Sequence, residues 1–269
     1  MCIRDSGKTS AKEMIKLALS AHGKTYASSG NYNNHIGTPL NLANLPPDIE
    51  YAVLEMGMNH AGEISQLTRM VQPHVALITT VEAVHLEFFE SVDGIADAKA
   101  EIFEGVGEGG IAILNADNRY LTRLKMAAAR NNISHVITFG DALEADIRLI
   151  TYQADASGCS MDISVGDTLL PCRLSAIGKH WAKTVLMTLA ITRALGLSLD
   201  VSAKALSSFS EPEGRGKLEA ISVSGGVATL INDSYNASPA SMKAAFAKTA
   251  ECWEALGKKG RKIAALGDM

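Results

Sequence analysis

The first regular pattern in the chain is helical. Apolar residues recur every three or four positions at Ala11, Met14, Ile15, Ala18 and Leu19, and the pattern stops at Gly23. Residues with this spacing share one face of a helix, so we predict a helix over residues 9–22 that buries this face.

Short apolar runs then alternate with helical patterns. We predict strands at about 24–28, 51–55, 74–80, 110–114 and 134–139, several of them rich in β-branched residues. Helices are predicted near 61–71, 93–106 and 118–131. Such alternation builds parallel sheets that helices cover on both faces, which indicates an α/β fold with a mostly parallel sheet flanked by helices.

The pattern changes near residue 146. Three short alternating runs separated by polar turns predict a small antiparallel β meander, at 147–152, 159–165 and 168–174. Helices are predicted next at 179–196 and 199–209, and Glu211-Pro212-Glu213-Gly214 has the composition of a linker. We therefore predict one domain over residues 1–210 and the start of a second over 211–269. Its predicted elements are strands at 217–224, 227–232 and 262–266 and a helix from Pro239 to Leu256.

Composition narrows the function classes. Hydrophobic residues make up 47% and charged residues 20%, as in globular proteins, and no apolar run reaches the roughly 18 residues of a membrane span. A net charge of -4 without a basic block argues against nucleic acid as the main partner and leaves small anionic ligands open. The four cysteines lack metal-site spacing, and we see no signal peptide. We therefore expect free thiols in the reducing cytoplasm.

Both ends of the chain interrupt the pattern. Residues 1–6 fit no element, and Cys2 stands where a complete phosphate loop, G-x-x-x-x-G-K-[ST], has its first glycine. The last predicted strand ends in a glycine turn with no helix after it. We expect residues 1–6 to be non-native and the chain to be a fragment truncated at both ends.

Polar residues follow several predicted strands. They are Ser28 to Asn34, Glu55, Thr79, Thr80, His85 and Asn115. The carboxyl ends of parallel strands face helix N-termini and their positive dipole ends, so ligands gather there. We expect one edge of one sheet to carry these residues.

Three of these positions suggest phosphate and metal chemistry. Gly7-Lys8-Thr9 opens a helix and would offer backbone amides and the Lys8 ammonium to phosphates, with the Thr9 hydroxyl on Mg²⁺. Glu55 ends an apolar strand before a tight turn, where a carboxylate suits a hard cation. The ordinary alternatives are a plain helix start and a glutamate that leaves a strand for solvent. For His85 the alternative is a surface or core histidine.

Lys99 lies beside an apolar helical stripe formed by Ile95, Ala98, Ile102, Phe103 and Val106. Its ordinary interpretation is a lysine whose stem covers apolar surface while its ammonium stays in water.

The motifs together resemble one family. They are Gly7 to Met14, the stretch Gly30 to Gly37 with Pro39-Leu40, Leu54 to Asn59, His85-Leu86-Glu87, Ala98 to Phe103, Asn115 to Asn118, Gly214-Arg215, and Asp233 to Pro239. In this order they resemble the Mur ligases, the ATP-dependent amide-forming enzymes of bacterial cell-wall synthesis. The Asp-Ser-Tyr-Asn-Ala run is most similar to the branch that adds D-alanyl-D-alanine to a UDP-N-acetylmuramoyl-tripeptide.

The resemblance implies a phosphate-loop central domain and a Rossmann-like ligase domain. It implies three sets of site residues: catalytic Lys8, His85, Lys99 and Arg215; nucleotide-binding Gly7, Lys8, Thr9, Asn115, Asn118, Arg215 and Asp233; and metal-binding Thr9, Glu55, His85 and Lys99. ATP, two Mg²⁺ ions and CO₂, held as a carbamate on Lys99, would be the cofactors. The protein would be a cytoplasmic monomer.

The implied reaction proceeds through an acyl phosphate, which the amine of D-alanyl-D-alanine attacks. One departure concerns Thr184, where the family usually has asparagine, so a nucleotide contact there is in doubt. The domains that would grip the UDP-sugar and the dipeptide are absent or mostly missing, and we expect this fragment alone to be inactive. Another ligase of the same superfamily, such as a folylpolyglutamate synthase, and a non-catalytic phosphate-loop module stay open as alternatives.

Overall fold

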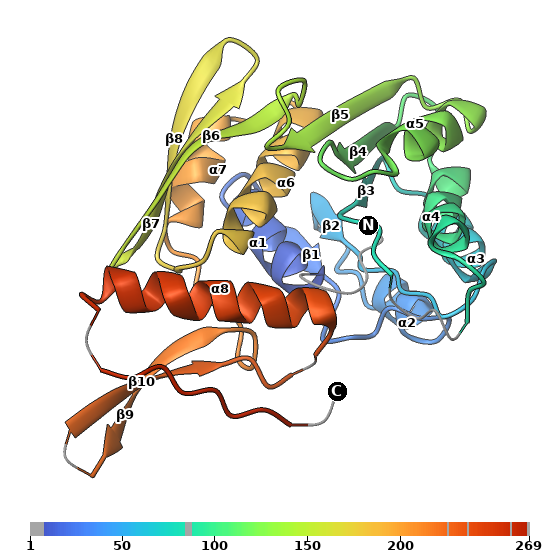
Figure 1. Cartoon of the computed structure of the whole chain (residues 1–269). Helices are drawn as coiled ribbons and strands as arrows, with labels where there is room; N and C mark the ends of the chain where they lie inside the picture. The colour runs from blue at the N-terminus through green and yellow to red at the C-terminus, as the bar shows by residue number, and fades with distance from the viewer. Residues whose placement is uncertain (1–7, 84–87, 225, 236, 259, 268–269) are drawn as a thin grey trace.

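A six-stranded sheet runs through the larger part of the molecule (Figure 1). The computed structural model describes residues 8–83, 88–224, 226–235, 237–258 and 260–267. In spatial order the strands are β3 (Val75–Ile78), β4 (Ile111–Asn115), β5 (His135–Gly140), β6 (Ile147–Asp155), β7 (Gly158–Val165) and β8 (Thr168–Leu174). Strands β3 to β6 pair parallel, and β7 and β8 continue the sheet antiparallel from β6. The prediction of an α/β fold with a meander is confirmed, and the meander continues the same sheet.

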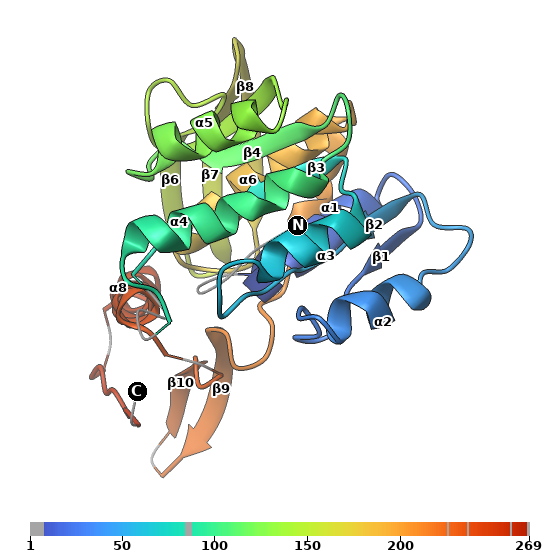
Figure 2. The ribbon, with the colours of Figure 1, turned by 90° about the vertical axis from the view of Figure 1, so that its right-hand side faces the viewer.

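Burial on both faces explains the apolar parallel strands. Leu77 and Ile113 are fully buried register partners that face one layer of helices, α1 (Lys8–Ser20), α6 (His180–Ala194) and α7 (Leu199–Leu206). Their neighbours Ala76 and Ala112 face the other layer, which contains α3 (Glu63–Val71), α4 (Val92–Ala100) and α5 (Leu121–Arg130). Figure 2 shows α3 and α4 in front of the sheet and α6 behind it. Such strands need no polar alternation because water reaches neither face.

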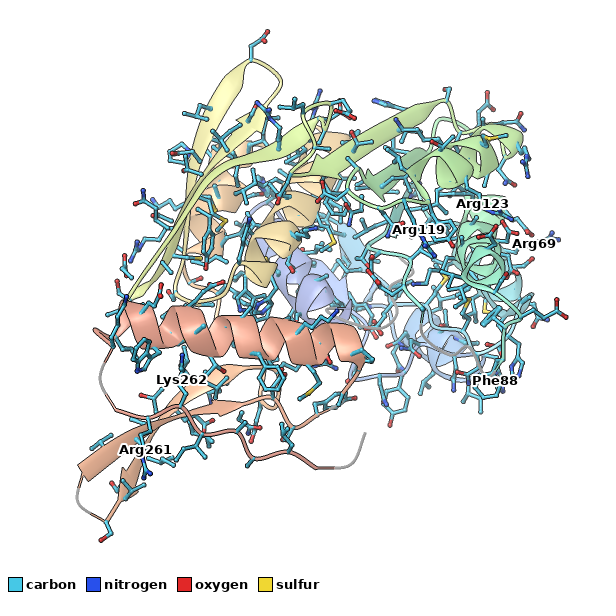
Figure 3. All side chains as sticks on the ribbon, in the orientation of Figure 1. Arg69, Phe88, Arg119, Arg123, Arg261 and Lys262 are labelled. Atoms are coloured by element: carbon cyan, nitrogen blue, oxygen red, sulfur yellow. The ribbon has the colours of Figure 1, made fainter. Side chains whose placement is uncertain are left out.

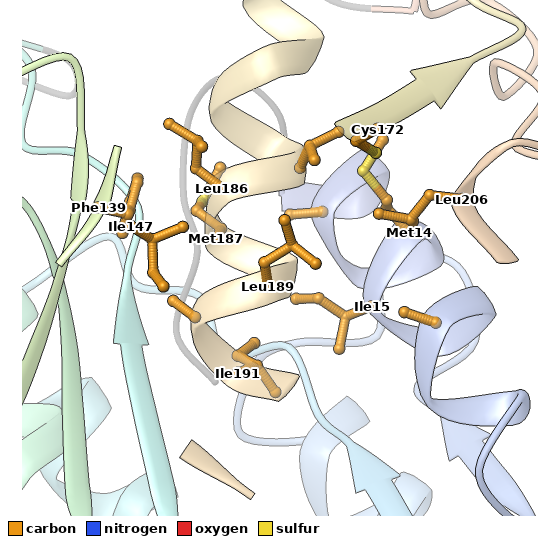
Figure 4. Close-up of a cluster of buried hydrophobic side chains, with 14 of the residues drawn as sticks. Met14, Ile15, Phe139, Ile147, Cys172, Leu186, Met187, Leu189, Ile191 and Leu206 are labelled. Carbon is orange, nitrogen blue, oxygen red and sulfur yellow. The ribbon is translucent and has the colours of Figure 1, made fainter. Parts of the chain in front are cut away.

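Helix α6 is the centre of the first layer. Figure 4 shows its apolar side chains between the sheet and helix α1. The labelled residues include Leu186, Met187, Leu189 and Ile191 from α6, Phe139 and Ile147 from the sheet, and Met14 and Ile15 from α1. Because α6 is apolar on nearly all sides, it is buried as a core helix rather than lying on the surface.

A second, smaller ladder lies apart from this sheet. Strands β1 (Thr25–Ala27) and β2 (Tyr51–Val53) are parallel and pair with each other. Val53 nevertheless shares its core with α1 and the large sheet. The prediction of one edge of one sheet is therefore wrong, because Glu55 follows the small ladder whereas Thr79 and Asn115 follow the large one. A complete phosphate-loop motif has a strand directly before its helix. In this chain that position lies outside the described residues, which begin at α1.

Two helical details differ from the sequence pattern. Helix α2 (Gly37–Ala43) follows the asparagine-rich turn and was not predicted. The helix predicted over residues 93–106 divides into α4 and a 3-10 helix, η1 (Glu101–Gly105). No helix among the described residues has both the length and the apolarity to cross a membrane.

The remainder of the chain, from residue 211 onward, is called the second segment. It contains a hairpin and a helix, and it lies below the larger part of the molecule in Figure 1. Strands β9 (Lys217–Val223) and β10 (Gly226–Asn232) pair antiparallel, and α8 (Pro239–Ala255) follows with Ser238 as its N-cap and proline in its first turn. The predicted strand at 262–266 is wrong. Ile263 is 78% exposed and Lys262 lies over the Trp253 ring at 4.5 Å (Figure 3). A strand exists only through a neighbouring ladder, and no described strand pairs with this stretch.

The hairpin turns of the meander yield a stability prediction. Gly158 has φ +139°, and a Cβ there would lie 2.0 Å from the carbonyl oxygen of Leu174. Gly166 has φ +59° with open space around it. We expect Gly158→Ala to lower the free energy of unfolding by at least about 2 kcal/mol, and Gly166→Ala by only about 1 kcal/mol. Thermal unfolding of both variants checks this, and equal losses would contradict it.

Candidate functional site

The start of helix α1 contacts the second segment. Nη2 of Arg215 donates a hydrogen bond of 3.1 Å to Oγ1 of Thr9. The same guanidinium lies over the Tyr235 ring, 4.2 Å from its centroid, which limits its freedom. Two predicted site residues, Thr9 and Arg215, are therefore adjacent although 206 positions separate them. Gly7 lies outside the described residues, as does the side chain of Lys8.

A buried lysine ties α1 to the loop after β1. Lys12 is 1% exposed, and its Nζ donates to the carbonyl oxygens of Ser28 and, at 3.3 Å, Gly30. Glu13 lies 3.3 Å from the same ammonium. Buried charges are stable only when paired and hydrogen-bonded, so this cluster holds the loop in one position relative to the start of α1.

Glu55 follows β2 and is 2% exposed. Its Oε1 accepts a hydrogen bond of 2.7 Å from Nδ2 of Asn33, and its backbone N–H donates to Oγ of Ser28 at 3.1 Å. Its second oxygen, Oε2, is buried and has no hydrogen-bond partner among the described residues. The alternative of a glutamate that leaves the strand for solvent is therefore wrong. An unpaired buried carboxylate oxygen fits a cation ligand.

Lys99 and two asparagines converge on the end of β3. Lys99 is 3% exposed, and its Nζ donates to the carbonyl oxygen of Thr80 at 2.7 Å. Because its ammonium is buried, the alternative of a lysine with its head in water is wrong. Asn118 donates to Oγ1 of Thr80 at 3.0 Å, and Asn115 donates to the carbonyl oxygen of Thr79 at 3.2 Å. The structure thus brings Lys99, Asn115 and Asn118 together around one turn.

The amide groups of both asparagines also shape their own loop. Oδ1 of Asn115 accepts from the N–H of Asp117 at 2.9 Å, and Oδ1 of Asn118 accepts from that of Tyr120 at 3.0 Å. Such side-chain bonds to the backbone define a turn. A contact of either residue with adenine stays a prediction.

Asp233 and the linker complete the second segment's side of the site. Removal from water raises the pKa of Asp233, although the cations of Lys248 and Arg215 act in the opposite direction. Lys248, 2% exposed, pairs with the Glu211 carboxylate and donates to the carbonyl oxygen of Gly216 at 2.6 Å. This buried pair fixes α8 to the backbone directly after Arg215.

Helix α8 also reaches the larger part of the molecule. The carboxylate of Glu251 accepts a hydrogen bond of 3.0 Å from the Tyr152 hydroxyl and one of 3.1 Å from the backbone N–H of Lys179. Lys179 precedes α6, so the carboxylate sits at the positive end of that helix. These contacts hold the second segment where Arg215 can meet Thr9.

The predicted site therefore forms as three described groups: Thr9 with Arg215, Glu55 with Asn33, and Lys99 with Asn115 and Asn118. His85 lies outside the described residues. In the described ranges, no three His, Cys, Asp or Glu side chains gather as a protein-only metal cage needs. Mg²⁺ commonly binds one or two carboxylates together with substrate phosphates and water, which this arrangement suits.

Two contributors were not singled out as site residues by the sequence-based prediction. Asn33 stands within the asparagine-rich turn, and this turn was the only signal for it. Lys12 lies in the predicted helix over residues 9–22 and Ser28 among the strand-end polar residues, but nothing in the sequence pairs the two across 16 positions. Thr184, the departure from the family pattern, is buried within α6, where its carbonyl oxygen accepts from Oγ1 of Thr188 at 2.8 Å.

Comparison with known families decides the relationship. Residues 6–192 match the model of the Mur ligase middle domain. The chain belongs to the Mur ligase family. Curated relatives include two UDP-N-acetylmuramoyl-tripeptide--D-alanyl-D-alanine ligases. The one from Rickettsia prowazekii is 38% identical over 89% of this chain and 52% of its own length. The one from Escherichia coli is 35% identical over 98% of this chain and 56% of its own length. The chain thus spans about half the length of the curated relatives it matches.

Solved Mur ligase structures have the same fold. MurF from Acinetobacter baumannii superposes with a TM-score of 0.84 at 31% identity, over 93% of this chain and 53% of that one. MurF from Thermotoga maritima, solved in complex with ADP, gives 0.80 at 25% identity, over 93% and 56%. A mutant of L. casei FPGS gives a TM-score of 0.70 at 13% identity, over 93% of this chain and 71% of that one, which shows a shared fold alone.

An ion pair at the rim of the sheet yields a pH prediction. Asp117 accepts from the backbone N–H groups of Asp141 and Ala142 and pairs with Lys183 at 2.9 Å. Desolvation acts to raise the pKa of Asp117, but the Lys183 ammonium and these N–H groups hold it below its usual range. The folded state therefore gains stability above the unfolded pKa and loses it as pH falls through the folded pKa.

We expect Lys183→Met to cost roughly 0.5–1 kcal/mol near pH 7. The difference from the parent should shrink as acid protonates Asp117, because the ion pair then no longer exists. Urea unfolding at several pH values between about 7 and 2 measures this. Lys179→Met is the matched control, since Lys179 lies 3.7 Å from its partner Asp141. A difference that stays constant down to pH 2 would contradict the assignment.

Proposed function

We propose that the protein is an ATP-dependent amide ligase of peptidoglycan precursor synthesis, which joins D-alanyl-D-alanine to UDP-N-acetylmuramoyl-tripeptide through an acyl phosphate. Membership of the Mur ligase family and the names of its relatives support this reaction. The observation that carries it is the contact between Arg215 and Thr9. A ligase needs a site that two segments build together over ATP, whereas a simple nucleotide-binding module does not.

Phosphate binding is proposed at the start of α1. The backbone N–H groups of the first helical turn have no partners within the helix, so they attract the phosphates of ATP. Gly7 and Lys8 would lie against these phosphates. The Arg215 guanidinium already lies at Thr9, so it would reach the γ-phosphate and stabilise the negative charge that grows during transfer.

Two residues would hold the first Mg²⁺. Glu55 offers its unpaired buried Oε2, and Thr9 offers a hydroxyl oxygen that uses one lone pair for Arg215 and keeps another. This donor set of hard oxygens fits Mg²⁺. When bound, the ion would neutralise phosphate charge during transfer. His85 and Lys99 would serve the second ion.

Lys99 would act as a carbamate. A buried lysine is more readily neutral and therefore more nucleophilic toward CO₂. The ammonium would first lose one proton to become a neutral amine; the amine nitrogen would then bond to the carbon of CO₂ and release a second proton to solvent, which would leave a carboxylate-like anion. The carbamate nitrogen keeps one N–H, which can still donate to the carbonyl oxygen of Thr80 as it does now. The described geometry is thus compatible with this modification.

The remaining roles extend the same site. Asn115 and Asn118 would approach the adenine from the end of β4, and Asp233 would help hold the nucleotide from the second segment. We propose a domain boundary between residues 210 and 211, and a monomeric enzyme in the cytoplasm. The UDP-sugar and the dipeptide would contact parts of the protein other than the nucleotide site described above.

The proposal predicts a specific loss when Arg215 is removed. In the full-length protein, Arg215→Ala should lower kcat for phosphate release by at least about 100-fold, because one transition-state contact disappears. Arg215→Lys should retain part of the activity, since it keeps the charge and loses the planar fork. Arg261→Ala, an exposed arginine of the same segment, is the control (Figure 3).

The same assay distinguishes the alternatives. Phosphate release should need UDP-N-acetylmuramoyl-tripeptide and rise with D-alanyl-D-alanine but not with glutamate or diaminopimelate. Stimulation by glutamate would favour a folylpolyglutamate synthase-type ligase. Nucleotide binding without any phosphate release would favour a non-catalytic module.

Carbamylation makes a separate prediction. With ¹³C-labelled bicarbonate, the full-length protein should show a carbamate carbon signal that Lys99→Ala removes and Lys125→Ala, an exposed lysine of α5, retains. Turnover of the Lys99→Ala variant should fall and no longer respond to bicarbonate. A labelled signal that persists in Lys99→Ala would place the carbamate elsewhere.

A further inference from the structure

Asn33 contacts the Glu55 carboxylate through its side chain, and the sequence-based prediction gave it no individual role. Its Nδ2 donates to Oε1 of Glu55 at 2.7 Å. We propose that Asn33 is the positioning residue that orients Glu55, so that Oε2 faces a divalent cation. This inference rests on the proposed function, because it takes Glu55 as a metal ligand.

The backbone around Glu55 is held on both sides. On one side the N–H of Glu55 donates to Oγ of Ser28, and on the other the N–H of Gly57 donates to the carbonyl oxygen of Asn33 at 2.7 Å. With the main chain held at both points, the remaining freedom of Glu55 lies in its side-chain torsions. The Asn33 amide removes that freedom by binding one of the two carboxylate oxygens.

Gly57 permits this close approach. A Cβ at residue 57 would lie 2.7 Å from Oδ1 of Asn33, so a larger residue would push the amide away from Glu55. The tight contact therefore depends on both Asn33 and Gly57.

The chemistry of an amide suits this task. A lysine or arginine at position 33 would also hold Glu55, but its positive charge would compete with a cation for the same carboxylate. The neutral NH₂ group donates a hydrogen bond and leaves the negative charge of Glu55 for the ion. The buried, unpaired Oε2 is the atom that this arrangement presents.

The support continues to helix α1. Lys12 of α1 donates to the carbonyl oxygen of Ser28, and Oγ of Ser28 accepts from Glu55. The two proposed ligands, Thr9 and Glu55, are thereby linked through one helix and one loop. Precise metal sites need ligands held in this way by neighbouring groups.

The test uses Mn²⁺ as a spectroscopic probe, with ADP, on the full-length protein. Electron paramagnetic resonance gives the dissociation constant of Mn²⁺. We expect Asn33→Ala to weaken Mn²⁺ binding by about 10- to 100-fold, the usual effect of losing a group that orients a ligand. ADP binding at saturating Mn²⁺ should stay as in the parent, which a merely structural defect would not allow. Asn31→Ala, an exposed asparagine of the same turn, should bind Mn²⁺ normally.

A double-mutant cycle with Glu55→Gln shows whether Asn33 acts through Glu55. If it does, Asn33→Ala should add less than about twofold to the weakening that Glu55→Gln causes alone. Asn33→Ser, whose shorter side chain cannot reach Glu55, gives a second variant if Asn33→Ala does not fold.

Three results would overturn the inference, and they are distinguishable. Normal Mn²⁺ binding by the Asn33 variants, with weak binding by Glu55→Gln, would remove Asn33 and leave the metal site intact. Full additivity in the cycle would show that Asn33 acts independently of Glu55. Normal binding by Glu55→Gln would refute the metal site itself and with it this part of the proposed function.

Discussion

The site depends on charged side chains that are buried against the loops after the strands. Lys12, Glu55 and Lys99 are each 3% exposed or less. A buried charge without partners costs several kcal/mol, so the surrounding loops must supply hydrogen bonds. Both lysines take backbone carbonyl oxygens from loops that follow strands, which holds those loops in place. Glu55 accepts a hydrogen bond from the Asn33 amide on one oxygen. Its other oxygen has no partner among the described residues and is the atom proposed to bind a cation.

The two segments of the chain depend on one another through a few polar contacts. Lys248 fixes α8 to the backbone beside Arg215, and Glu251 fixes α8 to the start of α6. Both contacts lie far from Thr9 in sequence, and they hold the segment from which Arg215 contacts Thr9. Under the proposed function, this arrangement would make the phosphate site a shared property of two segments. A movement between the segments would therefore open or close the site without unfolding either one.

The sequence predicted the architecture well where hydrophobic periodicity dominates. The third meander strand has the predicted bounds, 168–174, and the alternation of strands and helices produced the parallel sheet. Helix α2 was not predicted, because it has only seven residues with a proline among them. The strand at 262–266 was predicted from its apolar residues, but local pattern cannot supply a pairing partner. Glu55 follows a strand and Lys99 lies on a helix, as the pattern predicts, while their roles at a metal site stay predictions. Asn33 and Lys12 make contacts between segments distant in sequence, which periodicity does not encode.

A crystal structure of the full-length protein with Mn²⁺ and a non-hydrolysable ATP analogue tests the central claim most directly. The anomalous signal of Mn²⁺ locates the ion independently of the protein atoms. The account predicts a Mn²⁺ ion about 2.0–2.3 Å from Oε2 of Glu55 and from Oγ1 of Thr9, with the Arg215 guanidinium on the γ-phosphate. An ion bound elsewhere, with Oε2 of Glu55 still unpaired, would contradict it.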